Sequence, residues 1–324
     1  MSLTEAQLEE RRTGVGGSDA ATVLGLNPFT TAYELYLDKR GEAPPEDTDF
    51  LKEARYWGSV LEQPVCDRYA EETGYRIQKS NQLIRSKEHP FMIATIDRKV
   101  VGEDRRIGFE AKTAARPEGW GESGSAEIPP YIMLQCQHYL AVTEYDYWDL
   151  GVLIGNRDYR SFRISPIKDI IGQLILAEEE FWDRVQNGVP PEPQWQSAAT
   201  TRLIKNLYPG TNGAVIELPE VANEYHAVCQ DAKSQAKLFQ GIIDGCNNRI
   251  AMLMGEAAIG LLSGSAYTRK EQTRKAFSVD ETTFVVTRHT TKLPIAAVKA
   301  IENGTVIKIE GGNSNLNTGD DNEN

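Results

Sequence analysis

Residues 91–114 read FMIATIDRKVVGEDRRIGFEAKTA, and this stretch decides the fold that the sequence predicts. Two runs, 91–101 and 106–114, are short and rich in β-branched or aromatic residues, and turn-forming residues separate them, which is typical of adjacent strands. Acidic residues interrupt both apolar runs, where a carboxylate is costly to place without a partner. We therefore expect these carboxylates to have a chemical role.

The acidic residues come in a pattern that suits a divalent cation. Asp97 follows the apolar run, and a hairpin turn would bring it beside Glu110. Glu110 and Lys112 are two positions apart on a strand, so both side chains point to one face, while Ala111 points into the core and offers its backbone carbonyl. Such oxygen ligands suit Mg²⁺ or Mn²⁺. Lys112 would orient the attacking water or stabilise charge on a phosphate.

A pattern of Asp, then Glu-x-Lys, also arises by chance in a charged chain. Other polar residues that could belong to the same site are therefore needed to support it. Glu62 lies on an upstream predicted helix and is either another metal ligand or an ordinary surface carboxylate. Gln135 and Gln137 lie on an otherwise apolar predicted helix, and each faces either solvent or the site. His138 is either a catalytic base or a plain helix residue near a binding groove.

The order of the predicted elements indicates an α/β sandwich around a mixed sheet. A helical stretch at 18–40 is broken by Pro28, and Pro64 is expected in the first turn of a second helix, where no amide donor is required. The remaining periodicities predict elements in the following order: helix 57–73, strands 75–86, 91–101 and 106–114, helix 128–143, strands 147–155 and 159–164, and helix 167–187.

The sequence PPEPQW at 190–195 is typical of a domain boundary. We expect a catalytic domain at 1–195 and an extension at 196–310. In that extension, residues 218–262 are helical with breaks near Gly241 and Gly245, and residues 265–288 form a hairpin. The helical part either contacts a partner or another copy, or has no such role. The polar, acidic end at 311–324 is expected to be disordered.

Composition limits the class of protein. Hydrophobic residues make up 40% and charged residues 25% of the 324 residues, which is ordinary for a soluble globular protein. A net charge of −12 argues against a protein that simply coats nucleic acid, although the basic residues within 97–116 provide a local rim. No apolar run is long enough to cross a bilayer, and the N-terminus lacks a signal core. The four cysteines are widely spaced, so we expect reduced thiols and a cytoplasmic location.

Five motifs, in this order and spacing, resemble the YqaJ-like viral recombinase family, which is similar to lambda-type exonucleases and belongs to the PD-(D/E)xK nucleases. The resemblance covers residues 12 to about 165. The motifs are Arg12-Thr-Gly-Val-Gly-Gly-Ser18-Asp19-Ala20, Trp57-Gly58-x3-Glu62, His89-Pro90-Phe-Met-Ile-Ala-Thr-Ile-Asp97, Glu110-Ala-Lys112 and Met133-Leu-Gln135-Cys-Gln137-His138-Tyr139.

The resemblance implies a restriction-endonuclease-like core and roles for particular residues. Asp97, Glu110 and Glu62 would hold Mg²⁺, with Lys112 as the catalytic lysine and Gln135 placing the water or the metal's ligands. Arg12 and Ser18 would bind a 5′-terminal phosphate. This implies 5′-to-3′ degradation of one strand of duplex DNA, leaving 3′ overhangs for a single-strand annealing partner. It further implies ring-shaped homo-oligomers and a phage or prophage origin in a bacterial cell.

Two departures from the family pattern concern spacing. The gap between Asp97 and Glu110 is longer than in lambda-type enzymes, and Pro64 falls one residue later than the family's Glu-Pro pair. Neither removes a catalytic group. Two alternatives stay open: an endonuclease of the same fold, which would cut circular DNA, and a non-catalytic DNA-binding or assembly module that has kept the fold.

Overall fold

The computed structural model describes residues 9–44, 49–80, 82–96, 98–271, 273 and 293–308. The chain divides into two compact units, Met1–Tyr208 and Pro209–Asn324. The division falls after the expected boundary at 195, because α7 (Ala198–Leu207) contributes Leu203 to a core in the first unit.

The first unit is built on a five-stranded sheet in the order β2-β5-β6-β7-β8. Strands β6 and β7 pair in parallel, and the other neighbours pair antiparallel, so the sheet is mixed. A parallel pair needs a crossover connection, and here α5 (Pro130–Thr143) lies between the two strands in sequence. The bounds are β2 Arg76–Lys79, β5 Arg98–Val101, β6 Ile107–Ala114, β7 Tyr147–Ile154 and β8 Asp158–Ile164.

A smaller sheet has the order β1-β4-β3, with β1 at Val15–Gly16, β3 at Leu83–Arg85 and β4 at Met92–Thr95. The single strands expected at 75–86 and 91–101 are therefore wrong. Each is two strands that belong to different sheets. Local composition cannot reveal such a change of sheet, because it depends on which strands pair in the folded chain.

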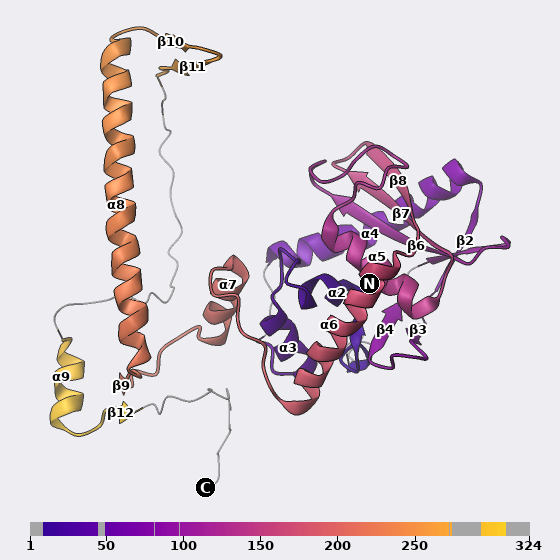
Figure 1. The fold of residues 1–324 in the computed structure, drawn as a ribbon, viewed down its shortest axis with the longest axis horizontal. Coiled ribbons are helices and arrows are strands. Elements are labelled where there is room, and N and C mark those ends of the chain that lie inside the picture. The colour runs from indigo at the N-terminus through magenta and orange to yellow at the C-terminus, as the bar shows by residue number, and fades with distance from the viewer. Residues whose placement is uncertain are drawn as a thin grey trace. The chain divides into compact units, whose positions relative to one another are not determined.

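Helices cover both faces of the large sheet (Figure 1). On one face, Val65 and Tyr69 of α4 (Asp49–Thr73) pack with Phe109 of β6. On the other face, Tyr139 of α5 packs with Trp148 of β7. The expected α/β fold, a mixed sheet flanked by helices, is confirmed.

Helix α4 corrects the expectation for Pro64. The helix begins at Asp49, so Pro64 lies in its interior rather than in its first turn. An interior proline costs a helix one backbone hydrogen bond. The apolar contacts that Val65 and Tyr69 make with the sheet hold the turns after it.

Three further helices belong to the described part of the first unit. The expected break at Pro28 is confirmed, because α2 (Gly17–Val23) and α3 (Ala32–Arg40) lie on either side of it. Helix α6 (Lys168–Asn187) matches the helix expected at 167–187. Val15, side chains of α3, and Phe181 and Val185 of α6 share one apolar core with Leu203.

The second unit contains one long helix, α8 (Val221–Met254), which runs unbroken through Gly241 and Gly245, so the expected breaks are wrong (Figure 1). The hairpin is β10 (Ile259–Leu262) with β11 (Ser265–Thr268), earlier than the predicted 265–288. The remaining elements among the described residues are α9 (Ile295–Glu302) and the parallel pair β9 (Ile216–Glu217) and β12 (Ile307–Lys308).

Two further expectations concern the chain as a whole. The tail predicted at 311–324 lies outside the described residues, as do positions 274–288 of the predicted hairpin. Among the helices that the structure describes, none combines the length and apolar character needed to span a membrane.

Candidate functional site

Strand β6 presents Glu110 and Lys112 to one face and Ala111 to the other, as their spacing predicts. Ala111 packs against the core beneath α4. Lys112 Nζ lies 2.7 Å from Glu110 Oε1. The carboxylate is buried and the lysine is a quarter exposed, so the ion pair lies at the border between core and solvent. The carboxylate therefore orients the ammonium group towards an accessible surface.

Helix α5 supplies Gln135, which completes the environment of Glu110. Its Nε2 donates to Glu110 Oε1 at 3.0 Å and to the Tyr139 hydroxyl at 2.9 Å. Oε1 of Glu110 thus accepts from both Lys112 and Gln135. Within the described part of the chain, Oε2 of the same carboxylate is buried without a hydrogen-bond partner. A buried carboxylate oxygen without a donor is costly, so Oε2 is suited to act as a ligand of a cation.

A recess beside Glu110 supplies further oxygen groups. It is lined by Gly58, Ser59, Glu62, Glu110, Ala111, Lys112 and Thr113. Carboxylates and a backbone carbonyl are the ligands that Mg²⁺ and Mn²⁺ prefer, so Glu62, Glu110 and Ala111 fit such an ion. The described residues hold no group of three or more His, Cys, Asp or Glu suited to a metal. Asp97, the remaining expected ligand, lies outside the described residues.

Glu62 has a partner that the sequence did not reveal. Arg98 of β5 is buried, and its Nη2 lies 2.9 Å from Glu62 Oε1 and donates to Gln63 Oε1 at 3.0 Å. The sequence predicted that the basic residues within 97–116 form an exposed rim. Arg98 is buried, so it does not belong to such a rim. Its position in the strand follows from pairing, since its Cα partner on β6 is Phe109, the residue before Glu110.

Two further recesses connect this centre to the N-terminal motif, and Ser18 and Gln135 line both of them. One also contains Lys112. The other is lined by Arg11, Gly16, Gly17, Ser18, Ile93, Thr95, Gln135 and Tyr139. The close approach depends on Gly17, because a Cβ there would collide with the Tyr139 ring. The structure therefore brings Ser18 to the same surface as Lys112 and Gln135.

The structure does not bring Arg12 to Ser18. Arg12 Nη2 lies 3.5 Å from Asp38 Oδ1 at the surface. Its neighbour Arg11 donates from Nη2 to Ser18 Oγ at 3.0 Å and lines the recess. Adjacent arginines point in different directions, and sequence alone cannot tell which one faces a site.

The alternatives for two other residues are settled by burial. His138 is fully buried, with Nδ1 2.9 Å from Glu178 Oε1 and Nε2 2.9 Å from the Ile93 carbonyl, so it is in the core rather than beside a groove. Gln137 is also buried and bonds the backbone of Ser165 and Ile167, so it faces neither solvent nor site.

Reasoning from sequence missed Arg11, Arg98 and the Tyr139 hydroxyl as neighbours of the site. Tyr139 follows Gln135 by one helical turn, so their contact was accessible from spacing. Arg98 follows Asp97 directly, but its burial depends on α4 packing across the sheet. No local signal separates Arg11 from Arg12.

Parts of the chain are similar to solved structures. An alkaline exonuclease, LHK-Exo, from Laribacter hongkongensis is 18% identical, with a TM-score of 0.43 over 62% of this chain and 100% of that chain. A phage related exonuclease from Haemophilus somnus 129PT is 12% identical, with a TM-score of 0.40 over 54% of this chain and 96% of that chain.

Similarity in sequence is stronger. The description "YqaJ-like viral recombinase domain" applies to the family profile that matches residues 7–146. The protein YqaJ of Bacillus subtilis (strain 168) is 33% identical over 258 residues, which is 79% of this chain and 79% of that protein. The match thus extends well beyond the motifs around Glu110. On this evidence the chain belongs to the YqaJ-like viral recombinase family.

Proposed function

We propose that the protein is a divalent-metal-dependent deoxyribonuclease that degrades the 5′-ended strand of linear duplex DNA. One observation carries the proposal: Glu110 has one oxygen held by Lys112 and Gln135 and the other buried without a donor among the described residues. Glu178 also has an unpartnered buried Oε2 among the described residues, but Glu110 differs because it lines a recess together with Glu62 and Lys112.

Several residues of the chain would bind the cation together. Glu110 and Glu62 would hold the cation, together with the Ala111 carbonyl and Asp97, which is expected here from its position one residue before Arg98. Gln135 would fix the Glu110 carboxylate by donating to Oε1. With Oε1 held in this way, Oε2 is the oxygen left for a cation.

Lys112 would act on the reacting phosphate. Its ammonium group is held by Glu110 at the border of solvent, where it can donate to a phosphate oxygen or orient a water for attack. A bound Mg²⁺ or Mn²⁺ would polarise the phosphate and favour hydroxide formation from water. The lysine charge would then offset the negative charge that develops in the transition state.

The recess at Ser18 supports recognition of a 5′-phosphate. Arg11 and Ser18 together offer a guanidinium and a hydroxyl, which bind phosphate oxygens well. We therefore place Arg11, rather than Arg12, as the cation of this subsite. Ser18 shares a recess with Lys112, so an end bound here would lie near the reacting centre.

Family membership supports the partners that we propose. DNA ends would be the substrate, and a single-strand annealing protein would receive the 3′ overhang in phage-type recombination. The exposed apolar side chains along α8 support a homo-oligomer, although a ring rests on the family resemblance alone.

The direct test uses duplexes labelled on each strand, with 5′-phosphate or 5′-hydroxyl ends, and a covalently closed circle. We expect Mg²⁺-dependent loss of the 5′-phosphorylated strand, slower loss from hydroxyl ends and no attack on the circle. Glu110→Ala, Lys112→Ala and Asp97→Ala should each abolish cleavage.

Three results would contradict the proposal in different ways. Cleavage of the circle would favour the endonuclease alternative. DNA binding without cleavage at any metal concentration would favour the non-catalytic module. Equal cleavage of both end types would contradict the 5′-phosphate subsite but would still support nuclease activity.

A further inference from the structure

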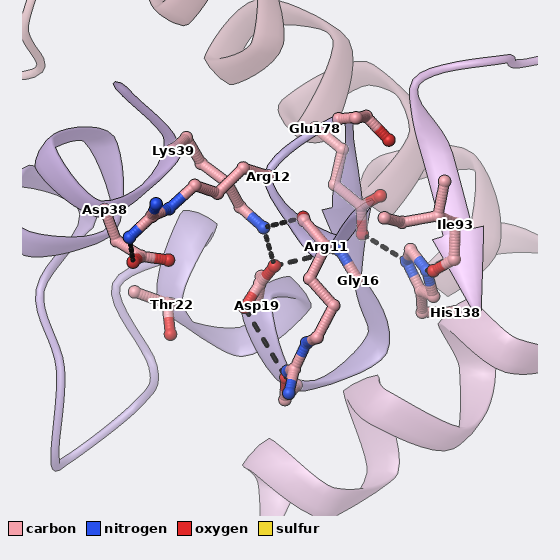
Figure 2. Close-up of polar contacts among 12 residues, drawn as sticks. Arg11, Arg12, Gly16, Asp19, Thr22, Asp38, Lys39, Ile93, His138 and Glu178 are labelled. Atoms are coloured by element: carbon pink, nitrogen blue, oxygen red, sulfur yellow. Dashed lines mark hydrogen bonds and ion pairs between the residues drawn. The ribbon is translucent and has the colours of Figure 1, made fainter. Parts of the chain in front are cut away.

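A buried lysine lies behind the recess that contains Arg11 and Ser18. Lys39 of α3 has a side chain that is only 3% exposed. Its Nζ lies 2.6 Å from Asp19 Oδ2 and donates to the main-chain carbonyl of Arg11 at 3.0 Å (Figure 2). A buried ammonium group is expensive unless it is paired, so these two contacts account for its burial.

Asp19, the partner of Lys39, also contacts the loop before α2. Its Oδ2 accepts a hydrogen bond from the Gly16 amide at 2.9 Å, and Ser18 is its neighbour in the chain. Burial would raise the pKa of Asp19, but Lys39 and the hydrogen bonds outweigh burial and lower it. The carboxylate is therefore ionised at neutral pH, and the ion pair is intact.

Lys39 also anchors the backbone that carries the phosphate-binding guanidinium. The Arg11 side chain reaches Ser18, while the Arg11 carbonyl is held by Lys39. Two residues later, Arg85 donates from Nη2 to Thr13 Oγ1 at 2.7 Å. The segment carrying Arg11 is thus held at Arg11 and at Thr13 before any DNA binds.

We infer that Lys39 is a positioning residue for the 5′-phosphate subsite. It holds Arg11 by donating to the Arg11 carbonyl, and it holds Ser18 through the ion pair with Asp19. The side chains of Arg11 and Ser18 are thereby placed to bind the same phosphate. This inference rests on the proposed function. Lys39 has no path to the phosphate itself, since it is buried beneath the loop. A subsite assembled in advance binds its ligand without the cost of ordering flexible groups.

The test measures binding rather than cleavage. Duplexes with 5′-phosphate or 5′-hydroxyl ends are titrated with protein in EDTA, and the ratio of the two affinities is compared between variants. Lys39→Met should reduce the wild-type preference for phosphate about tenfold, as expected when a binding group is misplaced. Arg40→Met, which removes one cation from the same helix but touches Glu42 and Val185, should keep the preference.

Two further variants separate positioning from folding. In an Arg11→Ala background, Lys39→Met should have little additional effect on the ratio, because contacting groups that act together are not additive. The pair Lys39→Met with Asp19→Asn removes both buried charges, which often leaves stability intact, and should lose the preference as Lys39→Met does.

The outcomes distinguish the inference from the proposed function. If the wild type binds both ends equally, the proposed end recognition fails and this inference fails with it. If the wild type and Lys39→Met prefer phosphate equally while Arg11→Ala does not, the phosphate subsite stands and the role of Lys39 is wrong. Additive losses from Arg11→Ala and Lys39→Met would also overturn that role.

Discussion

At the scale of single residues, two adjacent arginines have different surroundings. Arg11 reaches Ser18 at 3.0 Å, and Arg12 pairs with exposed Asp38 at 3.5 Å. An exposed ion pair at this distance contributes little, whereas a donor in a phosphate subsite contributes a charge-assisted bond. The family pattern implied that Arg12 binds the 5′-phosphate, whereas the geometry favours Arg11 for this role.

This difference predicts the behaviour of two matched variants. Arg11→Ala should lower the rate on 5′-phosphorylated ends about tenfold or more and leave the rate on 5′-hydroxyl ends nearly unchanged, because only the phosphate contact is lost. Arg12→Ala should keep the preference. Initial rates on the two substrates provide the measurement, and the reverse ranking of the variants would restore Arg12 to the subsite.

At the scale of elements, a buried ion pair joins α5 to α6. Burial alone would lower the pKa of His138, but Glu178 beside Nδ1 outweighs it and raises the pKa. The Ile93 carbonyl can only accept, so Nε2 carries a proton. Burial raises the pKa of Glu178, which opposes the ionised pair, whereas the raised pKa of His138 favours the charged ring, in which Nδ1 donates to Glu178. The pair thus links two helices to β4 inside the core.

The sign of this pKa shift gives a pH dependence. The stability from protonated His138 is fully present below its unfolded pKa of about 6.5 and is lost as the pH rises through the higher folded value. His138→Gln should reduce the free energy of unfolding by about 3–5 kcal/mol at pH 6. Urea unfolding of both proteins at several pH values measures this difference. The difference in the free energy of unfolding should shrink in alkaline solution. A constant or growing difference would contradict a positive charge on His138.

A second prediction at this scale concerns how closely α2 approaches α5. Gly17→Ala would push a methyl group into the Tyr139 ring and should destabilise the fold by about 1–3 kcal/mol. Gly172→Ala in α6 meets nothing within 4 Å and should stabilise it by up to about 1 kcal/mol. Thermal unfolding compares the two, and equal effects would show that the contact at Gly17 is not tight.

Sequence patterns predicted most elements around the centre because their signals are local. The alternation in β6 placed Glu110 and Lys112 on one face, and the prolines before α5 marked its start. The change of sheet between β4 and β5 was missed because it depends on tertiary pairing. The partner of Glu62 was missed for the same reason, since Arg98 reaches it across the packed interior.

At the scale of the whole molecule, α8 presents an apolar stripe without a buried residue. All of its 34 residues are described, and none is buried. Large apolar side chains on it recur at spacings that place them on one side, and they include Val221, Tyr225, Val228, Leu238, Phe239, Ile242, Ile243 and Leu253. A helix gains most of its stability from packing such a face, so we expect a second copy to cover it.

Substitution on the stripe tests this expectation. Phe239→Glu with Ile242→Glu should convert the oligomer to a monomer, because two charges would be buried in the contact. Gln230→Glu with Lys237→Glu, on the opposite side of the helix, should leave the mass unchanged. Sedimentation velocity measures the mass, and a wild-type monomer at micromolar concentration would refute the contact.

The binding of Mn²⁺ in the absence of DNA tests the central claim, that Glu110 uses its unpartnered oxygen to hold a divalent cation. Calorimetric titration of the wild type and Glu110→Gln should show binding in the first and an affinity at least about tenfold weaker in the second. Folding of both is checked by circular dichroism. Equal affinities in two folded proteins would contradict the account.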